Sequence, residues 1–191
     1  MIASTLQMIT VMKWMLFLSL LLLLGLLSEF VFSRTLQFDS CTVSVHTQEL
    51  RRHYTEIRSQ AISGDTEIGV MMLDRSTMTN IQSGQTCCYL RLLLRFYVEK
   101  VFRNFATSQP EELKRCSSAL ANAFVTVRRN INRCNCLCDE DTQRAIDSLN
   151  TEFDKLSINK AAQKAVAEMD TLLDWLDDLE GKTTVTDQPL T

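Results

Sequence analysis

Hydrophobic residues recur every three or four positions along most of the chain, which is the spacing of the buried stripe of an α-helix. The first stripe ends before Gly64 and Asp65, two residues that interrupt the pattern, and it consists of Leu50, Tyr54, Ile57 and Ala61. A second stripe is widened by further apolar positions, and its central residues are Leu90, Leu94, Tyr97, Val101 and Phe105. So wide an apolar face predicts a central, heavily buried helix.

Two later helices are predicted by their first turns as well as by their stripes. The sequence Ser-Gln-Pro-Glu at 108–111 resembles a capping box with proline in the first turn, so a helix should begin there. Its apolar positions keep the helical spacing as far as Ile131. Asp139, Glu140 and Asp141 place negative charge at the N-terminus of the next helix, where the helix dipole favours it.

The last helix is predicted to begin at about Lys160, with one inward stripe that consists of Ala162, Val166, Met169, Leu173 and Leu176. The polar residues 181–191 are expected to form a flexible tail. Residues 68–73 form either a short extended edge or an irregular turn packed on the bundle, because their periodicity fits both. The sequence holds no convincing series of strands, so we expect a compact all-α bundle over residues 34–180.

Residues 1–33 predict a signal peptide. The apolar run from Met15 to Leu27 has the length of a signal-peptide core and is shorter than the roughly 20 residues that a membrane span requires. Val31 and Ser33 suit the −3 and −1 positions of a cleavage site. The alternative is a single-pass anchor, but Glu29 interrupts it and no basic cluster follows. We therefore expect a secreted, extracellular protein that does not insert into a membrane after cleavage.

Seven cysteines lie behind this leader, and in an oxidising compartment they predict disulfide bonds. Cys87 and Cys88 are adjacent and cannot normally bond each other, so each needs a distant partner. The Cys-x-Cys-x-Cys run at 134–138 offers such partners, and Cys41 takes the one that remains. This reasoning pairs the clusters and leaves the individual pairs open. Cys116 is left over as a buried free thiol or, alternatively, as an intermolecular bridge.

A zinc site is the alternative use of these cysteines. The Cys-x-Cys spacing is tight for zinc, and the two histidines, His46 and His53, lie far away in the sequence. We therefore expect no metal ion and no other cofactor.

Charge and motifs exclude several classes of function. A net charge of −3 and a pI near 5.4 do not suggest a nucleic-acid partner. The chain has no HExxH, GxSxG or phosphate-binding loop, so we do not expect an enzyme. The remaining alternative is a disulfide-stabilised helical lipid carrier, in which Leu90, Leu94 and Tyr97 would line an internal cavity instead of a core.

Three segments carry a resemblance to a known family. They are CCYLRLLLRFYVEKVFRNF at 87–105, SSALANAF at 117–124 and KAVAEMDTLLDWL at 164–176. The arm RTLQFDSC at 34–41 matches the beginning of the mature family chain. By these segments the chain resembles the interleukin-10 cytokine family and, within it, the interleukin-19/20/24 group.

The resemblance implies the fold of a class II helical cytokine, a bundle of about six helices held by three disulfides. Carried over by position, these disulfides would join Cys41 with Cys134, Cys87 with Cys136 and Cys88 with Cys138.

The resemblance also implies a function. A cytokine of this group brings together two class II receptor chains, one of the interleukin-20 receptor beta type and one alpha-type chain of the interleukin-20 or interleukin-22 receptor. Such a heterodimeric receptor activates Janus kinases and STAT transcription factors in immune and epithelial responses. The cytokine does no chemistry of its own and is expected to act as a monomer.

By family analogy, receptor contacts come from the first helix, the loop that follows it and faces of the central and last helices. The exposed charges there are Glu49, Arg52, Glu56, Asp65, Glu67, Asp74 and Arg75. The alternative is that they are ordinary solvated charges. The acidic residues of the last helix, among them Asp170, Asp174 and Asp177, are interpreted as a solvent-facing surface. Trp175 is assigned to packing.

Overall fold

The computed structural model describes residues 13–15, 19, 34–38, 41–107 and 109–186. The chain divides into two compact units, Met1–Phe32 and Ser33–Thr191. In the first unit, the described residues 13–15 and 19 are helical, and the predicted signal peptide otherwise lies outside the described residues. Among the described residues, no helix combines the length and the apolar character needed to cross a membrane.

The second unit begins with a β-hairpin, which the all-α prediction missed. Strand β1, Arg34–Phe38, pairs antiparallel with β2, Cys41–Val45, in a register that places Arg34 opposite Val45. Four side chains of the hairpin point into the core, namely Leu36, Phe38, Val43 and Val45. β1 lies against the last helix and β2 against the long helix α6. Each strand has only two inward residues, so its alternation is too short to predict a strand from the sequence.

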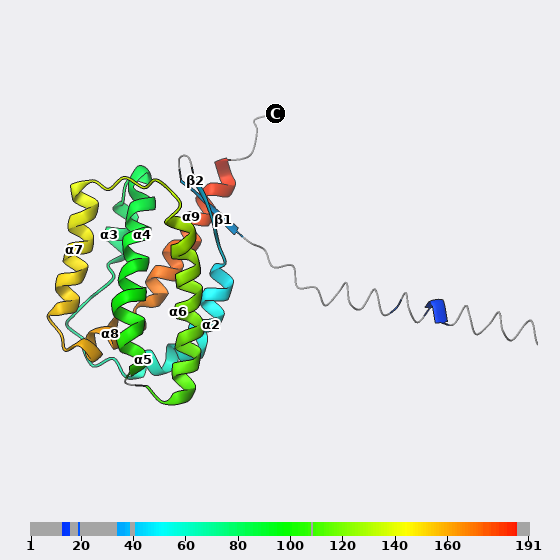
Figure 1. The fold of residues 1–191 in the computed structure, drawn as a ribbon. Helices are drawn as coiled ribbons and strands as arrows, with labels where there is room; N and C mark the ends of the chain where they lie inside the picture. Colours follow the sequence, from blue (N-terminus) through cyan, green and yellow to red (C-terminus); the bar gives the residue numbers. More distant parts are fainter. Residues whose placement is uncertain (1–12, 16–18, 20–33, 39–40, 108, 187–191) are drawn as a thin grey trace, which may run out of the picture. The chain divides into compact units, whose positions relative to one another are not determined.

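Helices make up most of the second unit (Figure 1). Their bounds are α2 Thr47–Ser63, α3 Arg75–Asn80, α4 Thr86–Phe96, α5 Phe102–Thr107, α6 Glu111–Ile131, α7 Glu140–Asp154, α8 Ile158–Ala167 and α9 Met169–Thr186. A 3-10 turn, Ser83–Gln85, precedes α4, and a π-helical segment, Tyr97–Val101, joins α4 to α5. The predicted disulfide-linked helical bundle is confirmed, with the hairpin added to it.

Two predicted boundaries differ from the structure. The last predicted helix is divided at Glu168 into α8 and α9. α9 then continues past Gly181 to Thr186, and residues 187–191 lie outside the described residues, so the extent of the tail stays a prediction. Residues 68–73 form an irregular turn rather than an extended edge.

The core is centred on α4, which Figure 1 shows between α6 and α7 with α8 and α9 behind it. Tyr97 is fully buried, its ring centroid lies 5.6 Å from that of Phe124, and its hydroxyl donates to the carbonyl of Ala165 at 3.0 Å. Leu90 and Leu94 are fully buried in the same cluster. These side chains therefore pack against one another and do not line a lipid-sized cavity.

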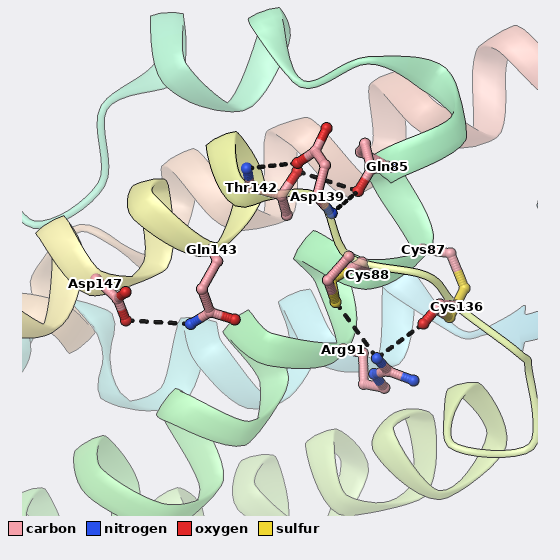
Figure 2. The surroundings of a disulfide bond; sticks show 10 residues. Gln85, Cys87, Cys88, Arg91, Cys136, Asp139, Thr142, Gln143 and Asp147 are labelled. Carbon is pink, nitrogen blue, oxygen red and sulfur yellow. Dashed lines mark hydrogen bonds between the residues drawn. A yellow bond between two sulfur atoms is a disulfide. The ribbon is translucent and has the colours of Figure 1, made fainter.

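Three disulfides tie one end of the bundle together. Their Cα–Cα distances are 5.4–5.6 Å, and they join Cys41 with Cys134, Cys87 with Cys136, and Cys88 with Cys138. These are the three pairs that the resemblance implies. In Figure 2, Arg91 points at this cluster; its Nη2 donates to the carbonyl of Cys136 at 3.0 Å and lies 3.4 Å from Cys138 Sγ. Cys116, on α6, is a half-buried free thiol.

Candidate functional site

The seven charged residues that the sequence singles out fall on three consecutive segments. Glu49, Arg52 and Glu56 lie on the exposed side of α2. The other four belong to the α2–α3 loop, which we define as residues 64–74, and to the first residue of α3. The seven residues thus belong to one continuous stretch of chain, but their surroundings in the structure differ.

Among the described residues, no close ion pair fixes the three α2 side chains. Glu49 Oε1 is 3.7 Å from His53 Nε2, one turn further along α2, and the Glu49 side chain is half exposed. Glu56 faces Cys116 of α6, where burial and the hydrogen bond to Glu56 raise the pKa of the Cys116 thiol. Arg52 is exposed. These three side chains therefore remain accessible to another protein.

The loop residues Asp65 and Glu67 are held by lysines of α8. Lys164 Nζ lies 2.9 Å from Asp65 Oδ2, and Lys160 Nζ lies 2.6 Å from Glu67 Oε1. The hydrogen bond from Lys160 is the main reason why the pKa of Glu67 is lowered. Only about a fifth of either acidic side chain is exposed. The prediction that these two acids are exposed is therefore wrong, because their carboxylates already pair with α8.

Glu168 lies at the break between α8 and α9 and holds the C-terminal end of the α2–α3 loop. Its Oε2 accepts hydrogen bonds from the backbone N–H groups of Met72 at 2.7 Å and Leu73 at 2.9 Å. Its Oε1 lies 3.3 Å from Lys164 Nζ. Burial alone would lower the pKa of Lys164, but the hydrogen bonds and charges of Asp65 and Glu168 outweigh that effect and raise it.

Between these two attachments the loop projects into solvent. Ile68 is 96% exposed and Met71 is 61% exposed, although both are large apolar residues. A Cβ added at Gly69 would meet nothing within 4 Å, so the space around the tip is open. Sequence reasoning treated this segment only as an ambiguous secondary structure. The apolar run Ile-Gly-Val-Met-Met-Leu was expected to pack on the bundle if it forms a turn, whereas only its end, Met72 and Leu73, is buried.

The loop ends at Asp74, which caps α3. The Asp74 carboxylate accepts hydrogen bonds from the backbone N–H groups of Ser76 at 3.0 Å and Thr77 at 3.2 Å. Hydrogen bonds from the Ser76 and Thr77 hydroxyls contribute most, and together with the backbone bonds they lower the pKa of Asp74 to about 2. Arg75 then reaches α9, with Nη2 3.2 Å from Asp178 Oδ2. Both residues therefore have structural partners.

The acidic residues of α9 were interpreted as a solvent-facing surface, but three of them contact α2 instead. Arg51 of α2 donates to Asp174 at 2.7 Å and to Asp177 at 2.5 Å. Arg58, two turns further along α2, donates to Asp170 at 2.8 Å. These acidic residues therefore join α2 to α9. Trp175, in contrast, is buried and edge-on to Tyr89, which confirms its assignment to packing.

A second surface feature lies between the hairpin, α2 and α6. It is a groove of about 390 Å³ lined by residues that include His46, Glu49, Asn122, Thr126 and Val127. The groove therefore lies at the beginning of α2, and the α2–α3 loop lies at the other end of the same helix. We refer to it as the α2–α6 groove.

The described residues offer nothing that resembles a catalytic or metal centre. No group of three or more histidine, cysteine or acidic side chains within them could hold a metal ion. The two surface features are instead an apolar loop tip and an open groove, which suit contacts with another protein.

Comparison with known proteins decides the family. The family model described as Interleukin 10 matches residues 18–181, which is most of the chain. The chain belongs to the interleukin-10 family. It is 30% identical to mouse interleukin-20 over 151 residues, which cover 76% of this chain and 85% of that protein. It is also 30% identical to mouse interleukin-19 over 141 residues, which cover 72% of this chain and 80% of that one.

Solved structures agree with this assignment. A PROSS-edited human interleukin 24 superimposes with a TM-score of 0.64 at 27% identity, over 75% of this chain and 97% of that one. Human interleukin-19 gives a TM-score of 0.63 at 25% identity, over 70% and 88% of the two chains. The chain is therefore a class II helical cytokine of a family whose members signal through class II cytokine receptors and are not enzymes.

Proposed function

We propose that this interleukin-10 family member is a secreted cytokine that brings together two different receptor chains. One chain is of the interleukin-20 receptor beta type and the other is an alpha-type chain of the interleukin-20 or interleukin-22 receptor. Their approach activates Janus kinases and STAT transcription factors. The observation that carries this proposal is the presence of two separate surfaces, the loop tip and the α2–α6 groove, at opposite ends of the same helix, α2.

The first proposed receptor surface is the tip of the α2–α3 loop. Exposed apolar side chains surrounded by ion pairs have the composition of an interface hot spot with a polar rim. Ile68 and Met71 are the apolar side chains here, and the Glu67–Lys160 pair lies beside them. A receptor pocket that covers both apolar side chains would remove them from water, which favours binding.

The second proposed receptor surface is the α2–α6 groove. It offers hydrogen-bonding groups, His46, Asn122 and Thr126, together with the carboxylate of Glu49. His46 lines the groove, although its Nδ1 is buried and makes no hydrogen bond within the described residues. Glu49 is the one residue of the predicted receptor set that lines this groove.

The bundle supplies a rigid separation between the two surfaces. α2 packs on α6, α8 and α9, and its residues Leu50, Tyr54 and Ile57 are buried. The disulfides hold the end of the bundle from which the groove is built, through Cys41 in β2 and Cys134 after α6. A receptor pair that binds both surfaces would therefore be held at one fixed distance.

Surface-directed variants test the two-surface arrangement. Replacing both Ile68 and Met71 by Ser should weaken binding of one receptor ectodomain, and Asn122→Arg, which places a large charge in the groove, should weaken binding of the other. Thr151→Arg, on exposed α7, is the matched control and should weaken neither. The arrangement is wrong when both surface variants weaken the same chain, or when neither weakens any chain in surface plasmon resonance.

The lipid-carrier alternative has less support. It requires a cavity lined by Leu90, Leu94 and Tyr97, and these three side chains are fully buried within the packed cluster.

We also propose that the cytokine acts as a monomer, because its free thiol, Cys116, is half-buried on α6 beside Glu56. Sedimentation of the oxidised protein tests this: a covalent dimer abolished by Cys116→Ser would contradict it.

A further inference from the structure

Four polar residues of α8 and its C-terminal end contact the end of α2 and the α2–α3 loop. They are Lys160, Gln163, Lys164 and Glu168, which we name the α8 polar face. Their spacing of three or four residues places them on one side of the helix. The opposite side of the same helix is apolar and faces the core through Ala162, Ala165 and Val166. α8 thus packs on the core with one side and holds a surface loop with the other.

The α8 polar face attaches the loop on both sides of its exposed tip. Before the tip, Gln163 Nε2 donates to the carbonyl of Ala61 at 2.7 Å, and Lys164 and Lys160 pair with Asp65 and Glu67. After the tip, Glu168 receives the backbone N–H groups of Met72 and Leu73. Only residues 68–71 lie between these attachments.

Gly64 leaves room for the Gln163 amide beside the end of α2. A Cβ at position 64 would lie 2.6 Å from Gln163 Nε2, so a larger residue there would push the end of the Gln163 side chain away from the carbonyl of Ala61. The absence of a side chain at the end of α2 is therefore part of the same arrangement.

Lys164 is the centre of the network. Its side chain is 9% exposed, and its ammonium group lies between the carboxylates of Asp65 and Glu168, which are each 17% exposed. A buried charge pair loses most when one partner is removed, because the other charge is left without compensation. Without Lys164, the two carboxylates would repel each other, and the loop would move away from α8.

The contacts of this network are internal, and this distinguishes it from a receptor-contacting surface. Both carboxylate oxygens of Glu168 and the ammonium group of Lys164 already have partners within the chain. The exposed groups nearby are instead the apolar side chains of Ile68 and Met71. We propose that Lys164 and Glu168 are positioning residues that hold the α2–α3 loop in its receptor-binding shape before a receptor arrives.

This inference rests on the proposed function, in which the loop tip binds one receptor chain. A flexible loop must lose conformational entropy when it binds, and a loop that is already fixed does not, so preorganisation strengthens binding. The network should therefore affect one receptor chain and spare the chain that binds the α2–α6 groove.

Two variants test the inference in the oxidised full-length mature protein. Lys164→Met removes the central charge and keeps the aliphatic side chain, and Glu168→Gln removes the charge opposite Lys164. Lys155→Met is the matched control, because Lys155 pairs with Glu152 on the surface of α7 at 2.6 Å. Two quantities are measured: amide hydrogen exchange of residues 65–73 in the free protein, and binding to each receptor ectodomain.

We expect faster exchange at residues 65–73 in both variants, with unchanged exchange in α4 and α6. We also expect binding about tenfold weaker to the receptor chain that depends on Ile68 and Met71, and less than about twofold weaker to the other chain. Weaker binding without faster loop exchange would overturn the inference, because Lys164 and Glu168 would then contact the receptor directly. An equal loss for both receptor chains would also overturn it, since it would indicate general destabilisation.

Failure of the proposed function can be recognised separately. If the double Ser variant at Ile68 and Met71 loses no binding to either chain, the loop is not a receptor surface. If that variant loses binding while Lys164→Met and Glu168→Gln do not, the loop is a receptor surface and the positioning inference is wrong.

Discussion

Arg51 shows how one side chain joins segments that are distant in the sequence. Its guanidinium group reaches from α2 to Asp174 and Asp177 of α9, and its hydrogen bonds raise the pKa of Arg51 although burial opposes this. The sequence alone interprets these acids as solvated because their partners lie on another helix. The spacing of charges along one helix indicates only pairs within that helix, so it cannot predict that Arg51 of another helix pairs with these acids.

We predict that Arg51→Ala lowers the free energy of unfolding by about 1–2 kcal/mol, because it removes a two-carboxylate contact that is only partly exposed. Arg144→Ala is the control, since Arg144 pairs with Asp141 within α7 and is mostly exposed. Urea denaturation measures both. Equal losses in the two variants would mean that the α2–α9 contact adds nothing beyond an ordinary surface pair.

Asp74 provides a prediction of pH dependence. Its pKa is about 2 in the folded protein against an ordinary value of 3.8, because Ser76 and Thr77 donate to its carboxylate. A lowered pKa means that the capping contribution is fully present above the ordinary value and is lost as the pH falls toward 2. The carboxyl carbon chemical shift of Asp74 should therefore titrate near pH 2. A midpoint near 3.8 would show that the cap does not form in solution.

At the scale of helices and strands, hydrophobic spacing predicts the helices well and their interruptions poorly. The inward residues Val166, Met169 and Leu173 keep the 3–4 spacing across Glu168, so the pattern cannot reveal the break between α8 and α9. The same holds for the π-helical segment that begins at Tyr97. The break matters because it turns Glu168 toward the α2–α3 loop, and this contact between distant segments has no signal in local periodicity.

Besides the main chain that continues from β2 into α2, the Cys41–Cys134 bridge attaches the hairpin covalently to the bundle. We predict that replacing both cysteines by Ser lowers the free energy of unfolding by about 4–5 kcal/mol, the chain-entropy value for a loop of this length. Amide exchange should become faster in the hairpin first. Cys116→Ser is the control, and chemical denaturation should show little change for it, because Cys116 forms no bridge.

The cysteine pattern was the most informative part of the sequence at this scale. Adjacent Cys87 and Cys88 require partners elsewhere, and the structure joins both to the segment that begins at Cys134. The individual pairs followed from the family resemblance, because spacing alone permits several connectivities.

For the whole molecule, the sequence identified the family and the position of the loop but not the chemistry of the surface. Of the charges predicted to contact a receptor, Asp65 and Glu67 are paired with α8, whereas the exposed tip consists of Ile68 and Met71. A charged residue in a loop looks accessible in a sequence. Whether it is accessible depends on lysines that lie almost a hundred residues away.

We propose above all that one rigid bundle binds two different receptor chains at once. The most direct measurement is the mass, by size-exclusion chromatography with light scattering, of the oxidised mature protein mixed with the beta-type ectodomain and each alpha-type ectodomain. We predict a complex of one cytokine with one chain of each type for at least one pair. Binding of only one chain at a time, or no binding with the disulfides verified, would contradict the two-receptor proposal.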